Sequence, residues 1–356
     1  MSNKIYFTPG PSQLFYSFQD HFKKAIAEDV PSISHRSAQF IKIVEESTAY
    51  LRHLLGLPDD YHLFFLNSAN ESWDRIVQNL VIKSSHHFAN GSFSKKFFDF
   101  AIQHGMQSTV QQAADGDNFQ DFTIPESAEL IGICKNETSV GFTSTEEEIA
   151  KLRNDNPTKL IALDVVSAAP AMPIDFSKVD TAYLSVQKAF GMPAGLGLWI
   201  ANDRCVEKAI QKSAQTSVGS YRTLPNLKKF ALKYQTPETP NMLFIYILGR
   251  IAKDLIDYGV KRMQNDTTYK ATLVNQTIEQ HPSLTHFVTS KAHRSTSTIV
   301  ATAQNQESFI SQLSNKGLVL GKGYGPHKDK HIRIANFPTH SKESVELLCD
   351  ILSKIE

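Results

Sequence analysis

The chain has 356 residues, of which 41% are hydrophobic and 21% are charged, a composition typical of an ordinary globular protein. Its 37 basic residues nearly cancel its 36 acidic ones, so neither a nucleic-acid-binding surface nor an acidic tail is expected. The three cysteines are far apart and form no CxxC pair, which excludes a disulfide framework and a thiolate metal site. The first residues lack the apolar core of a signal peptide, and no apolar run reaches membrane-spanning length. We therefore expect a cytoplasmic protein.

Strands and helices alternate along the first two thirds of the chain. A turn at residues 8–12 precedes a helix predicted over 37–55, because Phe40, Val44 and Leu51 fall on one face and Gly56 ends the pattern. Further helices are predicted over 70–82, 94–104 and 145–153, and buried strands over 62–66, 130–134, 160–163, 181–185 and 195–200. This alternation predicts an α/β domain whose mostly parallel sheet is covered on both faces.

The last third has a different composition, beginning with a turn at residues 235–240. A long helix is predicted over 242–263, then strands near 287–290 and 297–301, a helix over 306–316, a strand over 331–335 and a terminal helix from 341. We interpret this part as a smaller α+β domain. The predicted division is a large domain over residues 16–241 and a small domain formed by 1–15 and 242–356.

Three polar features stand where predicted strands end, the edge at which an open α/β sheet binds its ligands. Asp164 follows one strand, Lys188 follows the next, and Ser68, Ala69 and Asn70 join a strand to a helix. Each feature has an ordinary alternative: a turn-forming aspartate, a solvated lysine and a helix N-cap. In combination they indicate a site of chemistry.

The combination matches what pyridoxal 5′-phosphate requires of a protein. An amine such as that of Lys188 must attack the aldehyde in its neutral form, which burial favours. A carboxylate such as that of Asp164 pairs with the pyridine nitrogen. Backbone amides at a helix N-terminus hold a phosphate. Phe93, at the start of another predicted helix, offers a ring to stack on the cofactor.

Over most of its length the chain resembles the class V, fold-type I pyridoxal-phosphate-dependent aminotransferases, and among them the phosphoserine aminotransferases. The resemblance is carried by residues 7–14 (FTPGPSQL), 33–37 (ISHRS), 136–138 (NET) and the QK pair at 187–188. Residues 234–239 (YQTPET) are similar to a further family segment, and Arg333 lies in a matching strand. Cysteine desulfurases carry histidine before the lysine, so the QK pair separates this chain from them.

The resemblance implies a large domain built on a seven-stranded sheet, a Schiff base between pyridoxal phosphate and Lys188, and a homodimer with active sites at the subunit interface. Lys188 would also be the general base of a ping-pong reaction. The residues that it places around the cofactor are Ser68, Ala69, Asn70, Phe93, Thr138, Asp164 and Gln187, with Gln235 and Thr236 reaching the neighbouring subunit's cofactor. Those that it assigns to the substrate are His35, Arg36, His327 and Lys328 for the distal phosphate or carboxylate, and Arg333 for the α-carboxylate.

Two segments depart from the family pattern. The phosphate-binding turn is not glycine-rich, and the family's His-Arg pair before Arg333 corresponds here to His327 and Lys328, shifted by one residue. We expect amino transfer between 3-phosphoserine and 2-oxoglutarate, a step of serine biosynthesis. The alternatives are a class V aminotransferase of serine/alanine–glyoxylate type, a pyridoxal-phosphate-dependent lyase or desulfurase, and a non-enzymatic relative.

Overall fold

The computed structural model describes residues 4–355. Its strands are β1 (Ile5–Phe7), β2 (Tyr61–Leu66), β3 (Ser85–Ala89), β4 (Thr109–Gln112), β5 (Leu130–Cys134), β6 (Asn136–Glu137), β7 (Phe142–Thr143), β8 (Leu160–Asp164), β9 (Thr181–Ser185), β10 (Gly197–Asn202), β11 (Leu284–His286), β12 (Thr298–Ala303), β13 (Leu318–Lys322) and β14 (His331–Ala335). Its α-helices are α1 (Phe18–Ala27), α2 (Ala38–Leu55), α3 (Ala69–Leu80), α4 (Ser92–Gln103), α5 (Glu146–Asp155), α6 (Asp203–Ser213), α7 (Leu224–Ala231), α8 (Met242–Tyr258), α9 (Val260–Gln280), α10 (Gln306–Asn315) and α11 (Lys342–Leu352).

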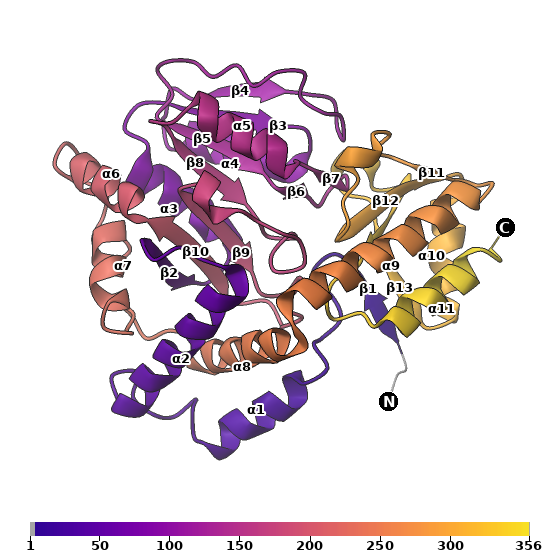
Figure 1. The fold of residues 1–356 in the computed structure, drawn as a ribbon, viewed down its shortest axis with the longest axis horizontal. Helices are drawn as coiled ribbons and strands as arrows, with labels where there is room; N and C mark the ends of the chain where they lie inside the picture. The colour runs from indigo at the N-terminus through magenta and orange to yellow at the C-terminus, as the bar shows by residue number, and fades with distance from the viewer. Residues whose placement is uncertain (1–3, 356) are drawn as a thin grey trace.

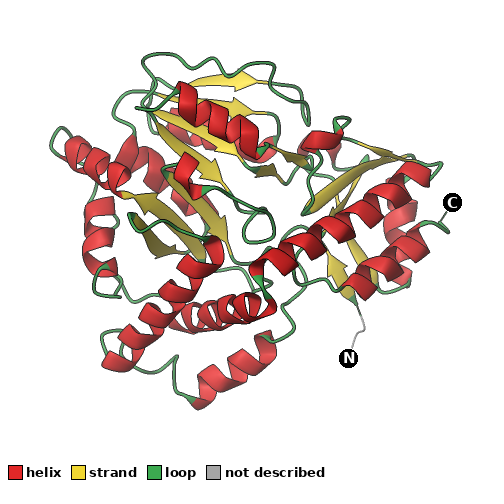
Figure 2. Ribbon diagram, viewed as in Figure 1, coloured by secondary structure: helices red, strands yellow, loops and turns green. Residues whose placement is uncertain are grey.

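The larger sheet has seven strands in the order β2-β10-β9-β8-β5-β3-β4. All neighbours are parallel except β10, which is antiparallel to both β2 and β9. Helices cover both faces of this sheet (Figures 1 and 2). The predicted α/β class with a mostly parallel sheet is therefore confirmed.

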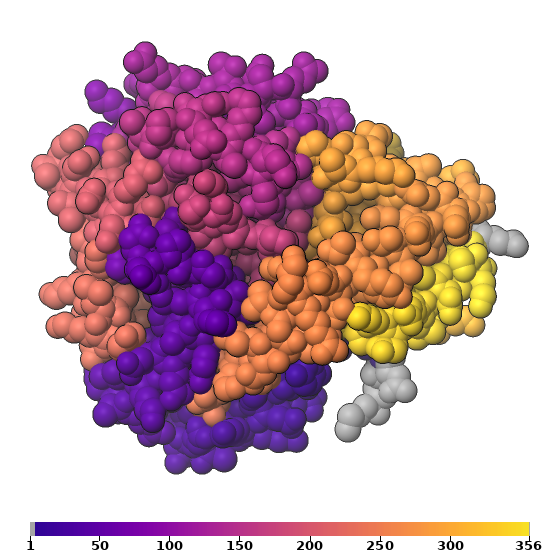
Figure 3. All heavy atoms as spheres, viewed as in Figure 1, coloured from indigo at the N-terminus to yellow at the C-terminus, as the bar shows by residue number. Residues whose placement is uncertain are grey.

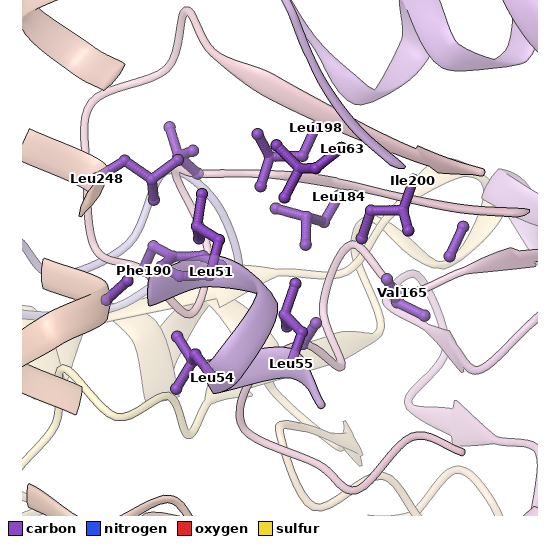
Figure 4. Packing of buried hydrophobic residues seen from close by; sticks show 14 of the residues in the cluster. Leu51, Leu54, Leu55, Leu63, Val165, Leu184, Phe190, Leu198, Ile200 and Leu248 are labelled. Carbon is purple, nitrogen blue, oxygen red and sulfur yellow. The ribbon is translucent and has the colours of Figure 1, made fainter. Parts of the chain in front are cut away.

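Alternate residues of each large-sheet strand enter different cores, as the two-residue period of a strand requires. Leu63 of β2 and Leu198 of β10 pack against α2 and α8, whereas Phe64 and Trp199 face α3 on the opposite side. Figure 4 shows Leu51 of α2 pointing toward the sheet residues of the first set. Burial on both faces explains why these strands read as continuous apolar runs in the sequence.

The smaller sheet has five strands in the order β1-β13-β14-β12-β11, and α9, α10 and α11 pack on it. Strand β1 pairs in parallel with β13, so the start of the chain joins a sheet built from its end. In the space-filling view the orange atoms of α8 and α9 run across the front from the large part to the small one (Figure 3). None of the helices within residues 4–355 could cross a membrane.

The predicted helix over 242–263 is wrong in its extent. Gly259, with a φ of 99°, ends α8 and caps α9, so two helices replace the single one. The predicted strand near 287–290 is also misplaced, because the pairing with β12 is made by Leu284–His286. Phe287 and Val288 instead pack against Phe142, so their apolar character reflects side-chain packing and not a strand.

The predicted two-domain division stays a prediction, but contacts around Gly259 bear on its boundary. Helix α8 packs along α2 in the core of the large sheet, whereas α9 packs on α11 and β12 of the small one. We therefore propose that the second boundary lies at Gly259 and not at residue 241.

Candidate active site

One cavity of about 190 Å³ lies where β2, β8 and β9 end. These strands point the same way, because β10 is antiparallel to both of its neighbours, so their carboxyl ends meet at one edge of the sheet. The predicted residues that line the cavity are Ser68, Ala69, Asn70, Phe93, Thr138, Asp164, Gln187 and Lys188. Gly10, Trp73, Asn136, Val166 and Ser185 complete its lining.

Lys188 is buried, with 8% of its surface exposed, and lies beyond the end of β9. Its Nζ donates a hydrogen bond to the Pro9 carbonyl oxygen at 2.6 Å and lies 5.6 Å from the centroid of the Phe93 ring. Burial, reinforced by the charge of Arg333, lowers the pKa of Lys188 from 10.5 to about 8. A buried lysine with a depressed pKa can act as a nucleophile or base near neutral pH.

Asp164 is the last residue of β8 and is 3% exposed. Burial raises the pKa of its carboxyl from 3.8 to about 7, and the Glu137 carboxylate adds to this effect. The Val166 backbone N–H opposes it by donating to Asp164 Oδ1 at 2.9 Å. A carboxyl group in this environment is stabilised in its charged form by a cationic partner.

The turn from β2 into α3 presents backbone amides to the cavity. Ser68 is the N-cap of α3, and its side chain accepts from the Glu71 amide at 3.2 Å. Within residues 4–355 the amides of Ala69 and Asn70 have no backbone or side-chain acceptor. A Cβ on Gly197 would lie 2.5 Å from the Ser68 carbonyl carbon, so β10 can support this turn only with glycine.

The remaining cavity residues are held by a polar network and by backbone contacts. Thr138 Oγ1 and Asn136 Nδ2 each lie 2.7 Å from Ser167 Oγ. The other polar atom of the Asn136 side chain, the buried Oδ1, has no partner in the described chain. Gln187 Oε1 accepts from Ser185 Oγ at 2.6 Å. These contacts fix the side chains at the carboxyl ends of β5 and β9.

Glu137 is a functional candidate that the sequence reasoning missed, although it is the central residue of the NET motif. It is fully buried, and its carboxylate accepts from the backbone N–H groups of Phe93 and Ser94 at the start of α4 and from the Ser139 hydroxyl. A carboxylate at a helix N-terminus is stabilised by the unpaired amides there. Glu137 thus fixes the helical turn that carries Phe93.

Gly10 is another missed position, and its backbone explains why glycine is required. Its φ is 120°, a conformation that favours glycine, and a Cβ there would lie 2.9 Å from Cε of Lys188. The segment that precedes α1 therefore lies directly against the lysine side chain. The turn predicted at residues 8–12 could have pointed to this close approach.

Arg333 lies on β14 of the small sheet and does not line the cavity itself, but it contacts Thr138, which does. Its guanidinium donates to the Lys322 carbonyl oxygen at 2.7 Å and to that of Thr138 at 3.4 Å, and its Cζ lies 5.4 Å from the Tyr324 ring centroid. Burial lowers its pKa from 12.5 to about 10, so it remains charged at neutral pH. Its charge also acts on Lys188, which lines the cavity.

Other predicted residues gather away from this cavity. Arg36 is exposed and donates to Gln235 Oε1 at 3.0 Å, and His35 Nδ1 lies 3.3 Å from the Thr239 hydroxyl. Thr236 is buried and donates to the Glu238 carbonyl oxygen. The segments 33–37 and 235–239 therefore come together, but they do not line the Lys188 cavity of the same chain.

His327 and Lys328 do not line it either. His327 Nε2 lies 2.8 Å from Asp115 Oδ2, and its ring stacks on His331 with centroids 4.4 Å apart. Lys328 is exposed, and its carbonyl oxygen accepts from the Gln306 side chain. Their predicted roles in substrate binding stay a prediction.

The donor set of the cavity fits pyridoxal phosphate. Lys188 supplies an amine that burial biases toward the neutral form, and Asp164 supplies a carboxyl suited to a protonated pyridine nitrogen. The free amides of Ala69 and Asn70 suit a phosphate. Phe93 lines the same cavity, as does Asn136, whose buried Oδ1 has no partner in the described chain.

Comparison with known proteins gives consistent results. A family model described as aminotransferase class-V matches residues 8–328. A solved structure of a phosphoserine aminotransferase from Cytophaga hutchinsonii is 42% identical, the match covers 100% of both chains, and the TM-score is 0.98. A phosphoserine aminotransferase from Phocaeicola vulgatus is 26% identical over 98% of each chain. An alanine–glyoxylate aminotransferase from Nostoc sp., 19% identical over 99% of this chain and 95% of its own, shares the fold with a TM-score of 0.85.

Proposed function

The chain belongs to the class-V aminotransferases, and from that premise we propose that it binds pyridoxal phosphate on Lys188 and transfers the amino group between 3-phosphoserine and 2-oxoglutarate. The observation that carries the proposal is the pairing of two buried groups in one cavity. Lys188 and Asp164 come from neighbouring strand ends, and burial brings both of their pKa values toward neutrality. Groups perturbed in this way mark functional sites.

The chain's own residues would divide the work as follows. When bound, the cofactor supplies an electron sink for the electrons released at the substrate Cα. Lys188 would move the proton, because an amine with a pKa of about 8 is partly unprotonated near neutral pH. Asp164 would keep the pyridine nitrogen protonated, and Phe93 would fix the plane of the ring. Arg333 would orient the substrate α-carboxylate with its guanidinium fork.

The phosphoserine substrate is supported by the relatives of that name, including the one 42% identical over the whole chain. A second candidate is an aminotransferase of serine/alanine–glyoxylate type. It is favoured by one observation: Asp115 bonds to Nε2 of His327 and His331 stacks on its ring. His327 is the residue that the family resemblance assigns to the substrate phosphate.

A half-reaction screen tests the proposal. The holoenzyme is mixed with O-phospho-L-serine, L-glutamate, L-serine or L-alanine in the absence of an acceptor, and the visible absorbance and the 2-oxo acid released are followed. We expect phosphoserine and glutamate to react well and serine and alanine poorly. The reverse order would favour the second candidate. Release of ammonia would indicate a lyase, and loss of sulfur from L-cysteine, added as a fifth substrate, would indicate a desulfurase. No change with any amino acid would indicate a non-enzymatic relative.

We also propose a homodimer in which the segments 33–37 and 235–239 complete the partner's cavity. The support is that Arg36 and Gln235 bond to each other outside the Lys188 cavity, as residues serving another chain would. Mixing the separately inactive variants Lys188→Ala and Arg36→Ala should restore roughly a quarter of wild-type activity. Random exchange of subunits makes about half of the dimers mixed, and each mixed dimer has one intact site of its two. Exchange of subunits without regained activity would contradict this arrangement.

For the location we propose the cytoplasm. Cys134, Cys205 and Cys349 are all free, which suits a reducing compartment.

A further inference from the structure

Tyr324 lies at a point where the small sheet meets α4 of the large part. Its ring stacks on Phe93 with centroids 5.0 Å apart, and its hydroxyl accepts from Lys96 Nζ at 2.8 Å. Lys96 Nζ lies 5.4 Å from the Phe93 centroid and 5.1 Å from that of Tyr324. Neither Lys96 nor Tyr324 lines the Lys188 cavity, but Phe93 does, so the pair lies one aromatic ring away from Lys188.

This pair offers hydrogen-bond donors that the chain itself does not use. Since Lys96 donates to the Tyr324 oxygen, the Tyr324 proton must point elsewhere, and an ammonium group has two further N–H bonds. Within residues 4–355 neither group has another acceptor, and no carboxylate lies within 4.0 Å of Lys96. Arg333, on the same Tyr324 ring, has backbone acceptors only. Lys96 and Arg333 are half-buried cations beside the same Tyr324 ring, and neither has a carboxylate partner in the described chain, which favours an anionic ligand at this ring.

The loop that carries Tyr324 is fixed by its own glycines. A Cβ on Gly323 would lie 1.9 Å from the His327 carbonyl oxygen, so the loop is tightly wound. Gly325 has a φ of 56° and rests against Ser92, the first residue of α4. This winding directs Tyr324 to Phe93 and leaves His327 against Asp115.

We propose that Lys96 and Tyr324 form the binding site for the distal anionic group of the substrate, the role that the family pattern would give to His327 and Lys328. The ligand is the phosphate monoester or carboxylate at the far end of an acidic amino acid, while Arg333 takes the α-carboxylate. This inference rests on the proposed amino-transfer function. It explains how the chain can bind an acidic substrate although the histidine of its loop is held by Asp115.

A purely structural role makes a different prediction. If the Lys96–Tyr324 bond only fastened the small sheet to α4, its loss would reduce the reaction of every amino acid by a similar factor. An anion site affects acidic substrates alone. The split between acidic and neutral substrates therefore separates the two roles.

The test compares Lys96→Gln and Tyr324→Phe with the wild-type holoenzyme in the half-reaction. We expect Lys96→Gln to lower kcat/KM for O-phospho-L-serine by about 10- to 100-fold, the effect of losing one charge-assisted hydrogen bond. Tyr324→Phe keeps the ring and should lower it by about 3- to 10-fold. The slow reaction of L-alanine should change by less than about 3-fold in both. The matched control is Lys95→Gln, which removes the same charge from an exposed neighbour on α4 and should change nothing.

Calorimetry with inorganic phosphate adds a readout that does not need turnover. The holoenzyme should lose about 10-fold or more in phosphate affinity in Lys96→Gln and none in Lys95→Gln. A loss of reactivity confined to phosphoserine assigns the pair to the phosphate, and a loss shared with glutamate assigns it to either distal anion. Unchanged phosphate affinity in Lys96→Gln, or selective loss in Lys328→Gln instead, would overturn the inference. A wild-type enzyme that reacts with no amino acid refutes the proposed function, while the phosphate titration still decides the site.

Discussion

Replacing Asp164 by asparagine removes one buried charge while keeping the shape of the side chain. Burial raises the pKa of the Asp164 carboxyl from 3.8 to about 7. Between these values the native protein keeps the proton, whereas the unfolded chain loses it. Because the unfolded chain then binds fewer protons, the stability of the cofactor-free wild type falls as the pH rises through this window. The asparagine variant has no such group and should lack this fall.

The difference between 3.8 and about 7 corresponds to about 4 kcal/mol, at about 1.4 kcal/mol per pKa unit, and sets the upper limit of the effect. The pKa of about 7 already includes the attraction between the Lys188 charge and the Asp164 carboxylate. The buried amide of an asparagine has its own polar atoms to satisfy, which offsets part of this limit. We expect Asp164→Asn to stabilise the cofactor-free protein by about 1–3 kcal/mol at pH 8, and by less at pH 5. In the holoenzyme the same variant should lose most of its amino-transfer activity, because the pyridine nitrogen loses its anionic partner.

Urea unfolding of the cofactor-free proteins at pH 5, 6.5 and 8 measures the effect. Asp180→Asn is the matched control, because Asp180 is as buried as Asp164 but pairs with Arg153 and Arg204. Breaking that cluster should destabilise the protein by about 3–5 kcal/mol. The reasoning is refuted if Asp164→Asn destabilises like Asp180→Asn, or if its effect does not grow with pH.

Three further variants probe the groups around the cavity. Lys188→Ala should abolish both amino transfer and the visible absorbance that survives gel filtration with pyridoxal phosphate; a retained half-reaction would exclude Lys188 as the attachment point. Glu137→Gln should lower the free energy of unfolding, measured in urea, by about 1–3 kcal/mol, because one neutral amide oxygen satisfies the backbone N–H groups at the start of α4 less well than a carboxylate does. An unchanged unfolding midpoint would argue against this capping role. Gly10→Ala should cost about 1–3 kcal/mol of stability and lower the affinity for the cofactor in an equilibrium titration, because the φ of 120° and the approach to Lys188 both disfavour a Cβ. Cofactor affinity equal to that of the wild type would show that the backbone around residue 10 can move to make room for the methyl group.

The strands of the large sheet were predictable because burial on both faces leaves an almost uninterrupted apolar run, as in Leu130–Cys134 and residues 160–163. Strand β3 was missed because His86 and His87 interrupt its pattern, although both are buried in the structure. Burial lowers the pKa of His87 to about 3, so it is neutral and behaves as a core residue. A sequence pattern that treats histidine as polar cannot anticipate this.

The small sheet was harder to predict for a different reason. Strand β1 pairs with β13 across more than 300 residues of sequence, and neither was predicted. Such short strands depend on partners that local periodicity does not reveal. The break at Gly259 was also missed, because the apolar pattern of α8 continues into α9 and a single glycine within a helical pattern is often tolerated.

At the site, the sequence was informative where function depends on strand ends and uninformative where it depends on distant contacts. Asp164 and Lys188 could be placed together because parallel strands share an edge. The bond between His327 and Asp115 joins residues 212 positions apart, and the stacking of Tyr324 on Phe93 is equally non-local. The loop at residues 323–330 was therefore interpreted through its basic residues, whereas its packing places Tyr324 on Phe93, which lines the cavity.

The opposed pKa shifts of Asp164 and Lys188 separate a site of chemistry from a structural ion pair. In a structural pair each charge stabilises the other, so the pKa of the acid falls and that of the lysine rises. Here the acid moves up to about 7 and the lysine down to about 8. Within the described chain Lys188 Nζ has no Asp164 carboxyl oxygen within 4.0 Å, and it donates to the Pro9 carbonyl oxygen instead. Two buried groups kept apart in one cavity, each with its pKa shifted toward neutrality, are arranged to act on a third group bound in that cavity.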